Sequence, residues 1–295
     1  MNLTNVVASA VKLLNRVSDE IDTIITNPEV EARIDAVPAN LGPYGVDPFG
    51  FDPQYLKRYA GLLVWMYRKY FRVQAIGTER IPEGRCLLVA NHSGQLPFDA
   101  AMISTALFVE REPPRFVRSM LERFVPDTPF VSTFMARCGQ ILGTPENCRR
   151  VLSNGDAILV FPEGVGGLNK TWRERYHLQR FGQGFMRLAI ETQTPIVPVV
   201  VIGAEEQAPS FFNAKALGKT FGLPAFPITA THPLIPGLGL LPLPVRYHIY
   251  FGEPLRFEGD ANDEDEVIVK KVETVRSTMQ AMVDDGLASR HHVFW

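Results

Sequence analysis

Residues 86–109 read CLLVANHSGQLPFDAAMISTALFV, an apolar strand, a short polar loop and an apolar helix in succession. His92 comes directly after the strand, and Asp99 lies behind Pro97 in the expected first turn of the helix. Strand-to-helix units of this kind build parallel sheets, whose functional sites lie at the carboxyl ends of the strands. The stretch therefore predicts both a type of fold and the edge of the sheet that carries a site.

The same alternation continues along the chain. Short β-branched runs predict further strands over residues 115–119, 141–143, 157–161, 196–203 and 247–255. Helical patterns are expected over residues 145–153, 182–192 and 263–288. Strands that alternate with helices predict an α/β fold with a mixed, largely parallel sheet flanked by helices.

The composition is typical of a globular protein with a small net charge. The 295 residues are 46% hydrophobic and 21% charged, which is enough to bury a large core. Thirty basic against thirty-two acidic side chains give a net charge of −2, so nothing favours binding to nucleic acid. The three cysteines lack zinc-type spacing, and we expect reduced thiols, no metal and a cytoplasmic location.

We expect three regions along the chain. Residues 1–75 contain amphipathic helices and a proline-rich linker, residues 76–260 form the α/β core, and residues 261–295 hold a C-terminal helix that packs on the core. Apolar residues recur at helical spacing over residues 3–26, without the basic region and unbroken apolar run of a signal peptide.

Two segments are candidates for contact with a membrane. A helix expected over residues 53–71 has an apolar middle between basic residues, which suits an anionic lipid surface but equally suits packing on the core. Residues 220–245 contain no charged side chain, yet their prolines exclude a continuous spanning helix. This stretch is either a buried lid or a second membrane contact.

The pair His92 and Asp99 has two interpretations. A carboxylate that accepts a hydrogen bond from one imidazole nitrogen leaves the other nitrogen free to take a proton, as a general base does. Alternatively, the histidine is an ordinary loop residue, and the aspartate merely stabilises the start of a helix. The pattern by itself does not separate the two.

A second polar stretch, FPEGVGGLNKTWRERYHLQRFGQGF, covers residues 161–185. Glu163 follows a predicted strand, as His92 does, and nearby glycines allow a ligand to approach the backbone. Basic side chains then gather and either bind a charged group of a substrate or form a solvated surface; they are Lys170, Arg173, Arg175, Arg180 and Arg187.

Three motifs in this order resemble the glycerolipid acyltransferases of the lysophosphatidic acid acyltransferase type. They are Asn91-His92 with Asp99, then Phe161-Pro162-Glu163-Gly164, then Pro195-Ile196-Val197-Pro198-Val199. The resemblance covers about residues 75 to 255. It departs from the family in two places: the loop from Ser93 to Phe98 is longer than usual, and Gly143-Thr144 stand where an arginine for the acceptor's phosphate would be sought.

The resemblance implies an O-acyltransferase that uses no cofactor or metal. His92 would act as the base and Asp99 would orient it, Phe161, Pro162, Glu163 and Gly164 would position the acceptor, and Lys170, Arg173, Arg175 and Arg180 would bind substrate charge. The donor would be acyl-CoA or an acyl-carrier protein.

The acceptor implied by the resemblance is lysophosphatidic acid, which would yield phosphatidic acid at the inner face of the membrane. The missing arginine leaves room for a neutral acceptor such as diacylglycerol, a long-chain alcohol or a glycolipid, unless Arg149 or the cluster at 170–180 replaces it. A catalytically silent lipid-binding protein with the same fold is a further alternative.

Overall fold

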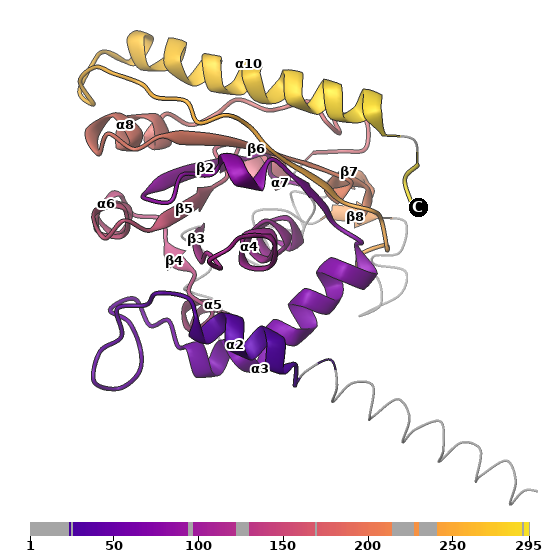
Figure 1. The fold of residues 1–295 in the computed structure, drawn as a ribbon. Coiled ribbons are helices and arrows are strands. Elements are labelled where there is room, and N and C mark those ends of the chain that lie inside the picture. Colours follow the sequence, from indigo (N-terminus) through magenta and orange to yellow (C-terminus); the bar gives the residue numbers. More distant parts are fainter. Residues whose placement is uncertain are drawn as a thin grey trace, which may run out of the picture.

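The computed structural model describes residues 24, 26–93, 97–121, 130–168, 170–213, 227–229, 241–290 and 292–294 (Figure 1). Nearly all of the helix predicted over residues 3–26 and most of the stretch over 220–245 lie outside these residues. Among the described helices, none combines the length and the apolar character that crossing a bilayer requires.

A seven-stranded sheet lies at the centre of the described part of the chain, in the order β1-β9-β6-β2-β5-β3-β4. β9 is antiparallel to β6, and every other neighbouring pair is parallel, so the predicted mixed, largely parallel sheet is confirmed. Its strands are β1 Gln74–Ile76, β2 Cys86–Ala90, β3 Val117–Leu121, β4 Ile141–Leu142, β5 Ala157–Val160, β6 Ile196–Ile202 and β9 His248–Phe251. β7 Ser210–Asn213 and β8 Pro227–Thr229 form a separate antiparallel pair.

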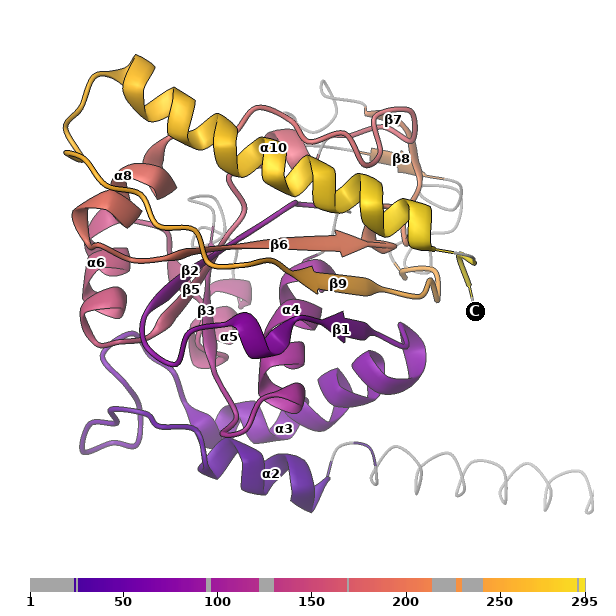
Figure 2. The same ribbon diagram turned by 45° about the horizontal axis from the view of Figure 1, so that its top comes forward.

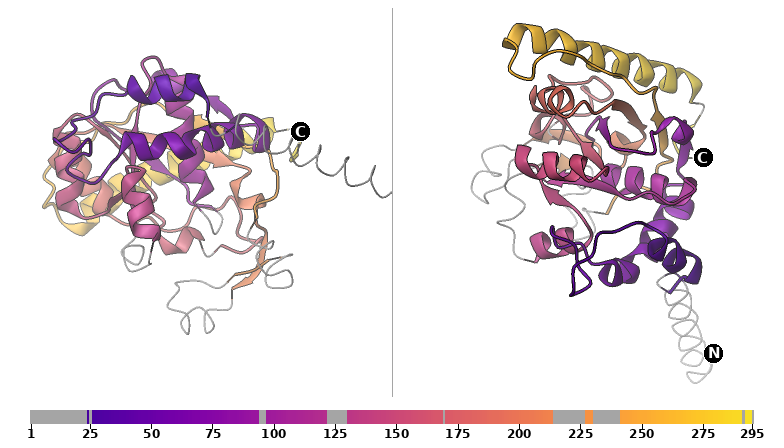
Figure 3. Two further views of the ribbon diagram at one scale, coloured as in Figure 1. Left: turned by 90° about the horizontal axis from the view of Figure 1, so that it is seen from below. Right: turned by 60° about the vertical axis from the view of Figure 1, so that its left-hand side comes forward.

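Helices cover both faces of the sheet. α6, α8 and α10 pack on one face and α4 packs on the other, with α2 and α3 beyond α4 (Figures 1 and 3). The α-helices are α2 Pro28–Asp35, α3 Pro53–Trp65, α4 Phe98–Glu110, α5 Val131–Arg137, α6 Pro145–Ser153, α7 Val165–Leu168, α8 Gly184–Glu191 and α10 Asp265–Ser289. A π-helical turn η1 Met66–Tyr70 continues α3, and two 3-10 turns are η2 Thr78–Arg80 and η3 Ala204–Glu206.

The central strand β2 contributes to two hydrophobic cores. Leu87 and Val89 belong to the core under α6, α8 and α10, whereas Leu88 and Ala90 belong to the core around α4. Successive side chains of a strand point to opposite faces, so a strand covered on both sides is apolar at every position. This is why β2 is an unbroken apolar run in the sequence.

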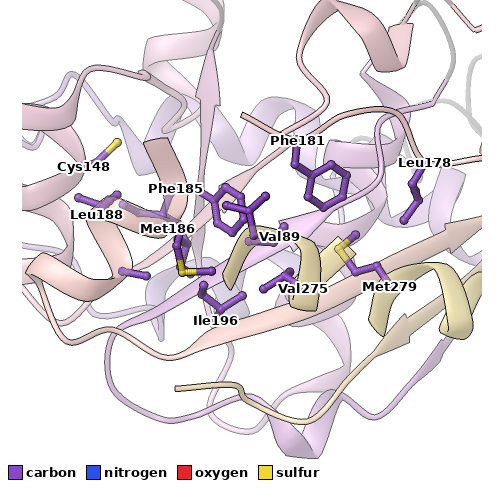
Figure 4. Packing of buried hydrophobic residues seen from close by; sticks show 14 of the residues in the cluster. Val89, Cys148, Leu178, Phe181, Phe185, Met186, Leu188, Ile196, Val275 and Met279 are labelled. Atoms are coloured by element: carbon purple, nitrogen blue, oxygen red, sulfur yellow. The ribbon is translucent and has the colours of Figure 1, made fainter. Parts of the chain in front are cut away.

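The C-terminal helix closes one of these cores. Val275 and Met279 of α10 lie against Val89 and Ile196 of the sheet (Figure 4). Figure 2 shows α10 running above β6 and β9. Near the end of the helix, an added Cβ at Gly286 would lie 2.9 Å from the ring of Tyr250, so the glycine allows close packing on the sheet.

A buried ion pair holds the proline-rich linker on the core. The Asp47 carboxylate accepts hydrogen bonds from the backbone N–H groups of Phe49 and Phe51, both at 2.8 Å. It also pairs with the guanidinium group of Arg118 on β3. That guanidinium lies 5.2 Å from the centre of the Phe51 ring. Residues 36–52 are irregular, as a proline-rich linker predicts, and this ion pair fixes them to the sheet. The irregular linker expected over residues 27–53 is wrong at its start, because Pro28–Asp35 form α2, with Pro28 in the first turn, where a missing N–H costs no helical hydrogen bond.

Replacing Arg118 by Met should lower the free energy of unfolding by about 3–5 kcal/mol, because it leaves the Asp47 carboxylate buried without its counter-charge. Urea denaturation measures this loss. Arg149→Ala removes a cation from the exposed pair with Glu191 and should change stability far less. Equal effects of the two substitutions would show that the linker is not held by the buried pair.

Candidate active site

Asn91 fixes the point at which β2 ends. Its side-chain amide donates to the carbonyl of Val201 at 3.1 Å and accepts from the N–H of Val201 at 2.8 Å. The side chain thus makes the two hydrogen bonds that a further backbone pair between β2 and β6 would have made. The chain is free to turn away at the next residue, which is His92.

His92 and Asp99 are in direct contact. Nδ1 of His92 lies 2.7 Å from Oδ2 of Asp99, whose side chain is fully buried. Oδ2 also accepts from the N–H of Ser93 at 2.9 Å, and Oδ1 accepts from the N–H of Ala100 at 2.7 Å. The long loop between the two residues does not separate them, because Asp99 lies in the first turn of α4.

The hydrogen bond sets the chemistry available to the imidazole. A carboxylate can only accept, so the neutral ring carries its proton on Nδ1 and presents the lone pair of Nε2. Nε2 makes no hydrogen bond to any described residue, and 11% of the side-chain surface remains exposed. One face of the ring stacks on Phe161, with 4.3 Å between the ring centres. The ring is thus held from two sides and open at the nitrogen that can take a proton.

Glu163 joins the second motif to the histidine. β5 pairs with β2, so the motif from Phe161 to Gly164 leaves the sheet beside His92. Oε1 of Glu163 accepts from the backbone N–H of His92 at 3.0 Å, and Oε2 accepts from the N–H of Gln179 at 2.8 Å. Gly164 has a left-handed backbone with φ of 52°, which allows the chain to turn sharply into α7.

The predicted basic cluster does not form one group. Lys170 is buried and forms ion pairs with Glu163 at 2.9 Å and Glu205 at 3.0 Å. Arg175 lies over the ring of Trp172 at 4.3 Å. The remaining two of the four proposed cations are exposed and form no hydrogen bond or ion pair with the described residues; they are Arg173 and Arg180.

One further residue of the site is not evident from the sequence. Glu205 lies far from Lys170 in the chain, and its only signal is a pair of acidic residues after a long buried strand. Gly167 is one of the glycines expected to let a ligand approach the backbone, but the protein itself approaches it: a Cβ there would lie 2.8 Å from the Cβ of His92 and 3.0 Å from that of Glu163. No group of three or more metal-ligating side chains occurs within the described ranges.

Comparisons with known proteins relate this chain to acyltransferases. Residues 72–202 match the family model described as Acyltransferase. An uncharacterised protein of Mycobacterium tuberculosis is 40% identical over 260 residues, covering 86% of this chain and 73% of that protein. A mouse protein named DGAT1/2-independent enzyme synthesizing storage lipids is 24% identical over 215 residues, covering 70% of this chain and 58% of its own length.

A solved structure has the same fold. The 1-acyl-sn-glycerophosphate (LPA) acyltransferase PlsC of Thermotoga maritima superposes with a TM-score of 0.50 and 17% identity, over 80% of each chain. At this level of identity the likeness concerns the arrangement of the sheet and helices.

Gly167→Ala should destabilise the protein by about 1–3 kcal/mol, since the added methyl group must displace the backbone of His92 or the side chain of Glu163. Gly166→Ala is the matched control, because its Cβ would come no closer than 4.0 Å to Gln179. Thermal unfolding of both variants measures the difference. Unchanged stability of the Gly167 variant would mean that α7 does not pack against the histidine loop.

Proposed function

Because this chain belongs to the family described as Acyltransferase, we propose that it moves a fatty acyl group from a thioester of coenzyme A or an acyl-carrier protein to a hydroxyl group of a lipid. The hydrogen-bonded pair of His92 and Asp99, with Nε2 left open, is the observation that carries the proposal. The position of both residues at the carboxyl edge of the sheet adds support.

In the proposed reaction, Nε2 of His92 takes the proton of the acceptor hydroxyl as the hydroxyl oxygen attacks the carbonyl carbon of the thioester. The carbon–sulfur bond then breaks, the ester bond is complete, and the proton passes from the imidazolium to the departing thiolate. Asp99 keeps the other proton on Nδ1 and stabilises the imidazolium with its negative charge. The stacked ring of Phe161 keeps the imidazole in its plane.

The motif from Phe161 to Gly164 is proposed to position the acceptor. A hydroxyl group that reaches Nε2 of His92 passes close to the Phe161 ring, which supports this role. Arg173, Arg175 and Arg180 are proposed to bind phosphate groups of the substrates. Gln179 donates its backbone N–H to Glu163, so Arg180 follows a residue that is anchored to the histidine loop.

The contacts of the basic residues favour a neutral acceptor such as diacylglycerol. Lys170 is already neutralised by two carboxylates. Thr144, at the place where the family's arginine would be sought, caps α6 through a hydrogen bond from the N–H of Asn147 at 3.2 Å. The mouse relative is named for the synthesis of storage lipids, which also supports a neutral acceptor. Lysophosphatidic acid is the second candidate, favoured by Arg173 and Arg180, which are exposed and form no ion pair with any residue that the structure describes.

Purified protein should release free thiol from long-chain acyl-CoA only when a lipid acceptor is present. We expect diacylglycerol to give faster release than lysophosphatidic acid, and His92→Ala to lower the rate by about 100- to 10,000-fold, the range for losing a general base. His292→Ala removes an exposed histidine near the C-terminus and should leave the rate unchanged.

Faster thiol release with lysophosphatidic acid than with diacylglycerol would reverse the proposed order of acceptors, but the proposed acyltransferase activity would stand. A His92 variant as active as the wild type would contradict the mechanism. The protein would instead be a lipid-binding protein without catalysis if no thiol were released above background. That test includes several acyl chain lengths, both acyl-CoA and acyl-carrier protein as donors, and both acceptors.

We also propose that the protein contacts an anionic membrane through an apolar patch, defined as Leu62, Trp65, Leu241 and Leu243. All four side chains are exposed. Tyr70 joins the two segments, because its ring contacts Trp65 and its hydroxyl donates to the carbonyl of Pro242, between Leu241 and Leu243, at 2.6 Å. Leu62 lies three residues before Trp65 on the same side of α3. Exposed cationic side chains on α3 and η1 would attract anionic head groups; they include Arg58 and Lys69.

The double substitution Leu62→Ser and Trp65→Ser should weaken sedimentation with anionic vesicles about tenfold or more, because burying each large apolar side chain contributes about 1.5–3 kcal/mol. Tyr44→Ser is the control, since Tyr44 is exposed on the linker loop outside the patch. Binding of the wild type should also fall as salt is added. A wild-type protein that stays in the supernatant at low salt would exclude the membrane contact.

A further inference from the structure

A bridge of buried charges runs from the histidine loop to the end of β6. Oε1 of Glu163 accepts the backbone N–H of His92, and Oε2 of the same carboxylate lies 2.9 Å from Nζ of Lys170. Nζ also donates to Oε1 of Glu205 at 3.0 Å. The second oxygen of Glu205 accepts from the N–H of Tyr176 at 2.6 Å. Each carboxylate in this bridge therefore binds both the ammonium group and the backbone.

The bridge is closed to solvent. The side chains of Lys170 and Glu205 are each 5% exposed, and that of Glu163 is fully buried. Burial alone lowers the pKa of Lys170, but the charges of Glu205 and Glu163 outweigh it and hold the pKa above its usual value. Burial raises the pKa of Glu205 despite the attraction of Lys170. The ammonium group is thus charged and committed to two partners inside the protein.

A phosphate group would have to displace these partners to reach Lys170. Removing the ammonium from Glu163 or Glu205 would leave a buried carboxylate without its counter-charge, which is costly. Glu163 would then be free to move, together with the peptide N–H of His92 that it holds. Binding substrate charge and holding the histidine loop are therefore competing uses of one side chain.

We propose that Lys170 and Glu205 are positioning residues for the catalytic histidine. Lys170 holds Glu163, Glu163 holds the backbone of His92, and Glu205 anchors Lys170 to the loop after β6. This inference rests on the proposed function and deepens it, because it removes Lys170 from the residues that bind substrate charge. It also adds Glu205, which lies in η3, to the functional residues of the site.

Lys170→Met and Glu205→Gln test the proposal against Glu206→Gln. Glu206 is the matched control because it is also buried and also holds one cation, Arg290 at 2.6 Å, which does not touch Glu163. A misplaced catalytic group costs about 100-fold in rate, so we expect Lys170→Met to lower kcat by about that factor with little change in the acceptor KM. Glu205→Gln should lower kcat less, and Glu206→Gln should not lower it.

Lys170→Arg keeps the positive charge and should restore part of the kcat that Lys170→Met loses, if it fits between the two carboxylates. A raised acceptor KM with kcat unchanged in Lys170→Met would instead assign Lys170 to substrate binding and overturn the proposal. Equal losses of kcat in the Glu205 and Glu206 variants would also overturn it, since the bridge would then have only a general structural role.

A measurement without substrate separates this proposal from the proposed function. The proton shared by Nδ1 of His92 and Asp99 should give a downfield NMR resonance, assigned by its loss in His92→Ala. We expect the resonance to broaden or disappear in Lys170→Met and Glu205→Gln, and to persist in Glu206→Gln. If Lys170→Met does not fold, both kcat and the downfield resonance are measured on Glu205→Gln. An undisturbed resonance in the folded bridge variants would contradict the positioning role even if the wild type proved inactive.

Discussion

The pairing of β2 with β5 on one side and β6 on the other is the constraint on which the site depends. This register brings His92, Glu163 and Glu205 together, because each follows the carboxyl end of one of the three strands. The amide of Asn91 completes the β2–β6 pair and sets the position at which the chain leaves the sheet. A shift of one residue in β2 would turn His92 to the other face.

Buried charge at this edge is balanced by specific partners. Asp99 accepts hydrogen bonds from the imidazole and from two backbone N–H groups. Glu163 and Glu205 share Lys170, and each also accepts from the backbone. Buried carboxylates without such partners would take up protons or disrupt the packing. Hydrogen bonds and ion pairs thus hold the carboxylates of the site in place, while Nε2 of the imidazole makes no hydrogen bond to any described residue.

The fold and the central pair could be predicted from the sequence because both depend on local patterns. Apolar runs fixed the strands, and the strand, loop and helix order brought Asp99 back to His92 across a loop of unusual length. The partners of Lys170 could not be predicted in this way. Five cations close together in sequence suggested one cluster, but Lys170 turns inward to Glu163, which also follows β5, and to Glu205, which follows β6. Glu205 reaches Lys170 because β2 pairs with β5 on one side and with β6 on the other, and no local pattern of the sequence encodes these pairings.

Under the proposed function, the carboxyl edge of the sheet is also the place where the protein would meet its lipid acceptor. Gln74 pairs with His248, and His248 pairs with Ile202 at the end of β6, so the chain after η1 enters the sheet on the side of His92. Ring contacts continue from Trp65 to Tyr70, to Phe71 and to Phe98, which directly precedes Asp99. A membrane bound at the apolar patch would thus lie on the same edge as the imidazole. Under the proposed function, a lipid hydroxyl could approach Nε2 without leaving the bilayer surface, while a water-soluble thioester approaches from the solvent.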